Sequence, residues 1–214
     1  MRSMQQFSLS VFVILLCAGL SAGADLESAK RAYEQKDYAS ALKDFSALAE
    51  KGNAEAQVLL GRMYLTGRGV AKDPDTGLKW FKAAATQGNA EGEFLLGSMY
   101  LLPRSDNAEG LRWVRLAADQ GNQDAQMLLG KTYMDGLPEL PRDPIQGEMW
   151  LRLAAKDNLP FYEAQLASAE REMSPDQIAK GKALAGAWKP KQGLRPEEKP
   201  TRDEKLGADG KPQS

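Results

Sequence analysis

One pattern of apolar and small residues occurs three times in the middle of the chain. Its copies are GNAEAQVLLGRMY at 52–64, GNAEGEFLLGSMY at 88–100 and GNQDAQMLLGKTY at 121–133. In the first copy Ala56, Leu60 and Tyr64 recur every four residues, which is the spacing of one stripe along an α-helix. The pattern therefore predicts three amphipathic helices, at residues 54–65, 90–102 and 123–134.

A second helical pattern follows each copy and carries an aligned tryptophan. The three segments are LKWFKAAATQG around Trp80, LRWVRLAADQG around Trp113 and EMWLRLAAKDN around Trp150. An earlier segment, ALKDFSALAEKG, has the same pattern with Asp44 in the tryptophan position, so we expect the array to start with half a unit. A repeat of this length with two helices per unit is typical of α-solenoids.

Aspartate residues mark where the second helices should begin. Asp73 and Asp143 are each followed by proline, which favours an N-cap with proline at the first helical position. Asp106 or Ser105 takes this place in the middle copy.

A glycine stands in the middle of each predicted first helix, at positions 61, 97 and 130. Glycine inside a helix costs about 1 kcal/mol relative to alanine. Its return in every copy therefore indicates that another helix approaches closely there. The second helices carry pairs of small alanine residues, which also permit close packing, at 84–85, 117–118 and 154–155. We expect the tryptophans and tyrosines to fill the space between neighbouring units.

Together these motifs resemble a Sel1-like repeat, a relative of the tetratricopeptide repeat. The first unit matches the family pattern at Leu60-Gly61, Tyr64, Gly67-Arg68-Gly69-Val70, Asp73, Trp80, Lys82-Ala83-Ala84 and Gly88. The second unit lacks the glycine loop, and the third replaces it with a proline-rich one. The resemblance covers residues 38–188.

This resemblance implies an all-α fold, a right-handed α/α solenoid of antiparallel helix pairs with about three and a half units. The segment SPDQIAKGKALAGAW is similar to the terminal capping helix of many bacterial members, with Ser174 as its N-cap and Pro175 next. The segment LESAKRAYEQKDYASALKDF resembles a tetratricopeptide-style opening.

The first 24 residues have the features of a secretory signal. Arg2 precedes an apolar run at 11–20, and the small residues at 22–24 suit signal peptidase cleavage before Asp25. The run is shorter than the roughly 20 residues that a membrane-spanning helix needs. Cys17 follows a leucine, whereas a lipidated cysteine would follow a small residue. We therefore expect a periplasmic protein without membrane insertion or lipid anchor.

Cleavage would leave one solenoid domain at 25–188 and a tail at 189–214. The tail contains four prolines, few apolar residues and no aromatic residue. Such a segment cannot bury enough apolar surface to fold, so we expect it to be disordered.

Composition narrows the chemistry that this chain can perform. It contains no histidine and one cysteine, and that cysteine lies in the predicted signal. Ser-His-Asp and Cys-His nucleophiles and Cys/His zinc sites are therefore excluded. Carboxylate pairs, Ser-Lys pairs and oxygen-ligand metal sites remain possible. The mildly acidic body is a poor nucleic-acid binder. We predict a monomer with no catalytic residue, metal or cofactor.

The resemblance implies that the first helices line the concave side, where three variable rows point to a protein-binding site. An apolar row flanked by an acidic and a basic row suits a peptide or protein partner. The rows are Glu55, Glu91 and Asp124; Val58, Phe94 and Met127; and Arg62, Ser98 and Lys131. Alternatively, the apolar row packs between repeats, and the acidic row interacts with the helix dipoles.

A further basic row lies beside the tryptophans of the second helices, at Lys82, Arg115 and Arg152. It could bind phosphate or make cation–π contacts, but a solvated outer face with side-chain stems over apolar surface is the simpler interpretation.

Two classes of function fit these features. Sel1-like proteins are generally interaction scaffolds, and small periplasmic members include immunity proteins that neutralise toxic lipase effectors. The resemblance thus implies an exported module that binds another protein, either an inhibitor of this kind or a general envelope assembly or stress adaptor. The alternative is an envelope enzyme with a carboxylate pair, for which the repeats offer no facing acidic residues.

Overall fold

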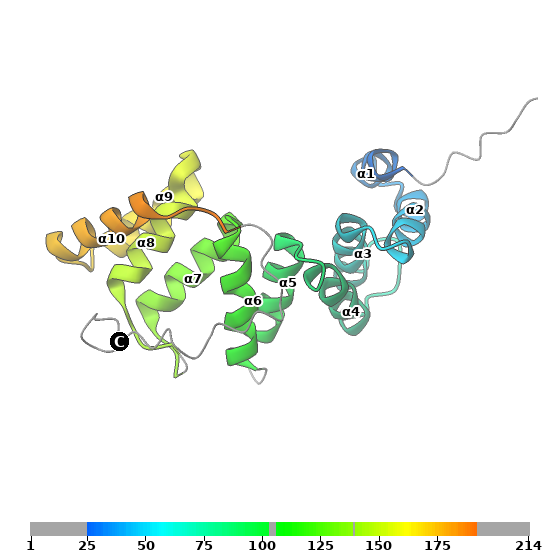
Figure 1. Ribbon diagram of the computed structural model, residues 1–214. Helices are drawn as coiled ribbons and strands as arrows, with labels where there is room; N and C mark the ends of the chain where they lie inside the picture. Colours follow the sequence, from blue (N-terminus) through cyan, green and yellow to red (C-terminus); the bar gives the residue numbers. More distant parts are fainter. Residues whose placement is uncertain (1–24, 103–105, 139, 192–214) are drawn as a thin grey trace, which may run out of the picture.

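The computed structural model describes residues 25–102, 106–138 and 140–191, and these form an array of ten α-helices (Figure 1). The helices are α1 Leu26–Glu34, α2 Tyr38–Glu50, α3 Ala54–Thr66, α4 Pro74–Ala85, α5 Ala90–Tyr100, α6 Asn107–Asp119, α7 Gln123–Asp135, α8 Pro144–Ala154, α9 Pro160–Glu170 and α10 Pro175–Ala187. A short 3-10 turn, Ala155–Asp157, follows α8. The predicted signal and all but the start of the predicted tail lie outside the described residues.

Successive helices pack as antiparallel pairs, α1 with α2, α3 with α4, α5 with α6 and α7 with α8 (Figure 1). Each second helix also packs on the first helix of the next pair, which stacks the units into an α-solenoid. The all-α solenoid prediction is confirmed. The expected half unit at the start is wrong, because α1 packs on α2 and completes a shortened pair.

Short polar side chains begin the helices of all three repeats. The first helices start after an asparagine whose side-chain oxygen accepts a backbone N–H three residues later, at Asn53, Asn89 and Asn122. The second helices start after an aspartate that does the same, at Asp73, Asp106 and Asp143. The predicted aspartate caps are confirmed, and Asp106 rather than Ser105 caps α6.

Glycines on both helices allow each pair to cross closely. A Cβ atom on Gly97 would lie 2.8 Å from the carbonyl oxygen of Gly110 and 2.8 Å from the backbone nitrogen of Val114. The predicted close approach is therefore confirmed. The sequence analysis missed the partner glycines on the second helices, which form the pairs Gly61–Gly77, Gly97–Gly110 and Gly130–Gly147.

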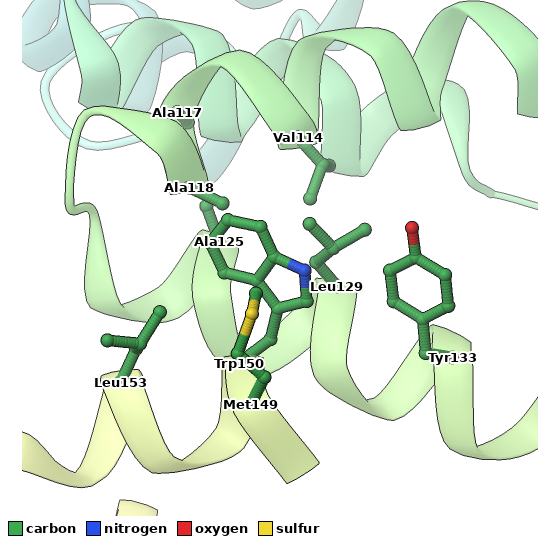
Figure 2. Close-up of a cluster of buried hydrophobic side chains, with 9 residues drawn as sticks. All are labelled: Val114, Ala117, Ala118, Ala125, Leu129, Tyr133, Met149, Trp150 and Leu153. Atoms are coloured by element: carbon green, nitrogen blue, oxygen red, sulfur yellow. The ribbon is translucent and has the colours of Figure 1, made fainter. Parts of the chain in front are cut away.

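Apolar side chains fill the space between units. Figure 2 shows the cluster formed by α6, α7 and α8, in which the Trp150 ring lies against Ala118, Ala125 and Leu129. Trp113 and Trp150 are buried, as predicted. Trp80 is only partly buried and packs against a separate cluster that contains Phe45 and Leu60.

Two helices close the far end of the array. The predicted capping helix is α10, which begins with a capping box between Ser174 and Gln177. It packs on α8 with Gly181 against Glu148, since a Cβ atom on Gly181 would lie 2.8 Å from the Glu148 Cβ. Helix α9 was not predicted, although the letters AQL at 164–166 echo the AQV and AQM of the first and third copies.

Candidate partner-binding site

The acidic row connects successive units. Glu55, Glu91 and Asp124 all lie in the first turn of their helices, as the helix-dipole interpretation predicts. The Lys30 ammonium lies 2.5 Å from a Glu55 oxygen, and the Arg62 guanidinium pairs with Glu91. These carboxylates are thus engaged within the array.

The third member of the acidic row binds a tyrosine of α9. The Tyr162 hydroxyl donates to an Asp124 oxygen at 2.8 Å. Burial, reinforced by this hydrogen bond, raises the pKa of Tyr162 to about 12. Asp124 therefore helps to hold α9 on α7.

The members of the apolar row are buried to different degrees. Val58 is only 4% exposed and cannot contact a partner in the folded protein. Phe94 packs against the cluster of Figure 2, and Met127 packs against the cluster that contains Leu151 and Ala169. Burial therefore removes Val58 from the candidate site, whereas Phe94 and Met127 keep part of their surface exposed.

The basic row has three different environments. Arg62 is paired with Glu91, and the Ser98 hydroxyl donates to the Phe94 carbonyl oxygen at 2.7 Å within its own helix. Lys131 is exposed, and no ion pair among the described residues includes it. Of this row, Lys131 is the member best placed to meet a partner.

Lys131 lies at the mouth of a groove between α7 and α9, which we call the α7–α9 groove. Its volume is about 120 Å³. Met134, Leu151 and Ala169 supply apolar side chains from the local core cluster. The other lining residues are polar or charged: Lys131, Asp135, Gln165, Ser168 and Glu172. The sequence analysis found Lys131 alone, because the other side of the groove belongs to the unpredicted α9.

The basic row of the second helices makes internal contacts, which corrects the prediction of a solvated face. The Arg115 guanidinium donates to the Tyr133 hydroxyl and lies 5.5 Å from the centre of that ring. Arg152 bridges Glu148 at 2.5 Å and Glu170 at 2.6 Å. Only Lys82 is exposed as expected.

Comparison with known proteins identifies the repeat. Residues 54–89, 90–122 and 123–159 each match the Sel1 repeat family model. This chain is a Sel1-repeat protein. Sel1 repeats are generally protein–protein interaction modules and are typically non-catalytic.

Two solved structures with Sel1-type repeats are similar to this chain. A Sel1 repeat protein from Oxalobacter formigenes is 27% identical, with a TM-score of 0.61 over 66% of this chain and 59% of that one. A protective antigen of uropathogenic Escherichia coli strains with an SLR fold is 21% identical, with a TM-score of 0.37 over 76% of this chain and 52% of that one. This Sel1-repeat chain therefore aligns with less than two thirds of either structure. No curated protein matches it.

Glu148 and Glu170 are two carboxylates that share one arginine, Arg152. Glu148 is fully buried, and burial raises its pKa while Arg152 opposes that shift. Arg152 holds Glu148 and Glu170 together and so joins α8 to α9. Among the described residues there is no group of three potential metal ligands and no helix long and apolar enough to cross a membrane.

Proposed function

We propose that this Sel1-repeat protein is an exported module that binds another protein on the face formed by its first helices, and that the α7–α9 groove at one end of this face is part of the binding site. The observation that carries the proposal is the groove itself. It combines an apolar floor with a charged and polar rim that α7 and the α9 segment supply. Protein interfaces commonly have this arrangement of an apolar centre and a polar rim.

Helices of successive units contact one another directly and so form a continuous face. Helix α3 contacts α5 and α7 contacts α9 directly, as expected for helices on the inner side of a curved array. At the rim of the groove, Lys131 can pair with an acidic group of the partner, while Gln165 and Ser168 can exchange hydrogen bonds with its backbone. The fitting partner is a protein segment that inserts an apolar side chain beside an acidic one.

The signal-like residues 1–24 support export to the periplasm. The partner would then be an envelope protein or a secreted one. If it is a toxic enzyme such as a lipase, this protein is an immunity protein that neutralises it; if it is an assembly factor, the protein is an adaptor. Both roles suit an exported repeat array, and the identity of the partner distinguishes them.

The proposal is tested by affinity capture from crosslinked envelopes with the chain that starts at Asp25. We expect Lys131→Glu to lower recovery of the specific partner about tenfold, as loss of one charged contact of about 1.4 kcal/mol would do. Ser168→Arg, which fills the groove from the α9 side, should do the same. Lys82→Glu makes the same charge change at an exposed second-helix position and should capture the partner normally.

The outcomes separate the alternatives. Recovery that depends on Lys131 and Ser168 supports the groove as the binding site, and the identity of the partner distinguishes an inhibitor from an adaptor. Equal recovery by all variants would show that the groove is not used. Equal melting temperatures of the variants are required as a control for folding.

A further inference from the structure

The three repeats share a buried polar position on their first helices, which is glutamine, glutamate and glutamine in turn. Its members are Gln57, Glu93 and Gln126, and their exposed fractions are 5%, 0% and 0%. A polar side chain that is removed from water must find hydrogen-bond partners inside the protein.

The amide nitrogens of the two glutamines make the same bond. The Gln57 amide donates to the Ala49 carbonyl oxygen at 3.1 Å, and the Gln126 amide donates to the Ala118 carbonyl oxygen at 3.1 Å. Both carbonyls lie in the last turn of the preceding second helix, and each belongs to the residue eight positions before its glutamine. The bond therefore ties one unit to the next.

The middle repeat keeps the surroundings of this bond. Ala85 lies eight residues before Glu93, and its carbonyl accepts the Gly88 N–H at 2.9 Å, as Ala49 accepts that of Gly52 at 3.0 Å. The second side-chain contact is also kept. Gln120 donates to the Glu93 Oε2 at 2.7 Å, as Gln87 donates to the Gln57 Oε1 at 2.7 Å.

What the middle repeat lacks is the donor. Glu93 Oε1 is buried and has no hydrogen-bond partner. An ionised carboxylate only accepts hydrogen bonds, whereas a protonated carboxyl group also donates one. Protonation of Oε1 would make Glu93 equivalent to the two glutamines.

We propose that Glu93 is a protonated carboxylic acid in the folded protein, and that its Oε1–H donates to the Ala85 carbonyl oxygen. The contact between α4 and α5 is then sensitive to pH. Ionisation of Glu93 removes the hydrogen bond between the end of α4 and α5 and leaves a charge inside the array. The equivalent hydrogen bonds of Gln57 and Gln126 do not depend on pH.

The charged groups on the neighbouring elements do not offset this charge. Lys82 on α4 is exposed, and Glu91 on α5 is paired with Arg62 of α3. On α6, Arg115 is bound to the Tyr133 hydroxyl and Asp119 is paired with Lys191. No ion pair among the described residues includes Glu93.

Burial also favours the protonated form of Glu93. It raises the pKa of Glu93 to about 7, against the opposing hydrogen bond from Gln120. In the unfolded chain a glutamate has a pKa of about 4.3. Between these two values the folded protein holds a proton that the unfolded chain has lost. Stability therefore falls as the pH rises from about 4.3 to about 7, and the contribution of Glu93 is constant above that window.

The test compares unfolding by urea from pH 4 to pH 8 for the wild-type chain and Glu93→Gln. Glutamine supplies the missing donor without a charge. We expect the folding equilibrium constant of the wild type, relative to the variant, to fall about tenfold per pH unit inside the window. A constant ratio across the whole range would overturn the proposal.

Two further measurements keep the test decisive. Gln126→Glu, which places a carboxyl group at the equivalent position of the third repeat, should add a second decline of the same kind. Infrared difference spectra at pH 6 should show a protonated carboxyl band in the wild type that is missing in Glu93→Gln. Absence of this band in the wild type would contradict the proposal even if a variant failed to fold.

Discussion

At Gly97 and Gly110 the backbones of α5 and α6 come so close that neither position has room for a side chain. A Cβ atom at Gly97 would meet the carbonyl oxygen of Gly110 and the backbone nitrogen of Val114, each at 2.8 Å. Backbone atoms inside helices cannot move aside as the end of a flexible side chain can. The low helix propensity of glycine is therefore offset by the packing that it permits.

We predict that Gly97→Ala lowers the free energy of unfolding by about 3 kcal/mol, since the added methyl group forces α5 and α6 apart. Gly186→Ala is the matched control. That glycine is also helical, but a Cβ atom there would have nothing within 4 Å. The control should gain about 0.5 to 1 kcal/mol from helix propensity. Urea unfolding measures both, and a wild-type midpoint for Gly97→Ala would contradict the packing account.

At the scale of the element, ion pairs differ according to the helices that they join and their burial. The Arg62–Glu91 pair links α3 and α5 with side chains that are 46% and 34% exposed. Arg152 links α8 and α9 through Glu170 and also pairs within α8 with Glu148, which is completely buried. A solvent-exposed pair contributes little, whereas loss of one partner of a buried charge leaves the other without compensation.

We therefore predict that Arg152→Met destabilises the protein by about 3 kcal/mol and loosens α9. Arg62→Met, the control with the same change at an exposed pair, should cost at most about 1 kcal/mol. Thermal melting measures the stability, and limited proteolysis reports release of α9. Equal losses in the two variants would show that burial of Glu148 does not decide the effect.

At the scale of the whole molecule, the end of the described chain returns across the array. After α10 the chain runs back toward α6 (Figure 1). The Trp188 ring lies edge-on to Trp150 with centroids 6.2 Å apart, and the Lys191 N–H donates to the Asp119 carbonyl at 2.8 Å. This segment connects the last helix with the end of α6. In a solenoid, where most contacts join neighbours, such a long-range contact secures the final units.

We predict that Trp188→Ala lowers the stability of the last units by about 2 kcal/mol, because a partly buried aromatic ring is lost. Hydrogen exchange should become faster in α7, α8 and α10. Exchange in α1 and α2 should stay unchanged, since these helices lie several units away and serve as an internal control. Uniformly faster exchange would mean that the whole array unfolds as one unit.

The sequence was most informative where a position repeats in every unit. The stripes around Ala56 and the aspartate caps are local features, so their spacing predicts the helices directly. The glycine column predicts close crossings because no other residue removes the side chain. By contrast, α9 differs from the first helices in all but a few letters, and the groove that it forms could not be predicted.

The candidate site shows the same division. The sequence placed Lys131 and Arg62 in one row, yet the structure pairs Arg62 with Glu91 and leaves Lys131 exposed. Equivalent positions have different contacts because their neighbours differ. The short Ser98 side chain, for example, donates to a carbonyl of its own helix. Val58 shows that an apolar residue on a variable row can be buried instead of exposed to solvent.

By itself, the sequence determined the all-α solenoid, its helix pairs and the caps of its second helices, since these depend on local propensity and on spacing along one helix. Only the tertiary structure decided which charged residues are engaged internally, where α9 and α10 pack, and that Glu93 is buried without a donor for Ala85. Those properties depend on side chains that are distant in the chain and meet only when the units stack.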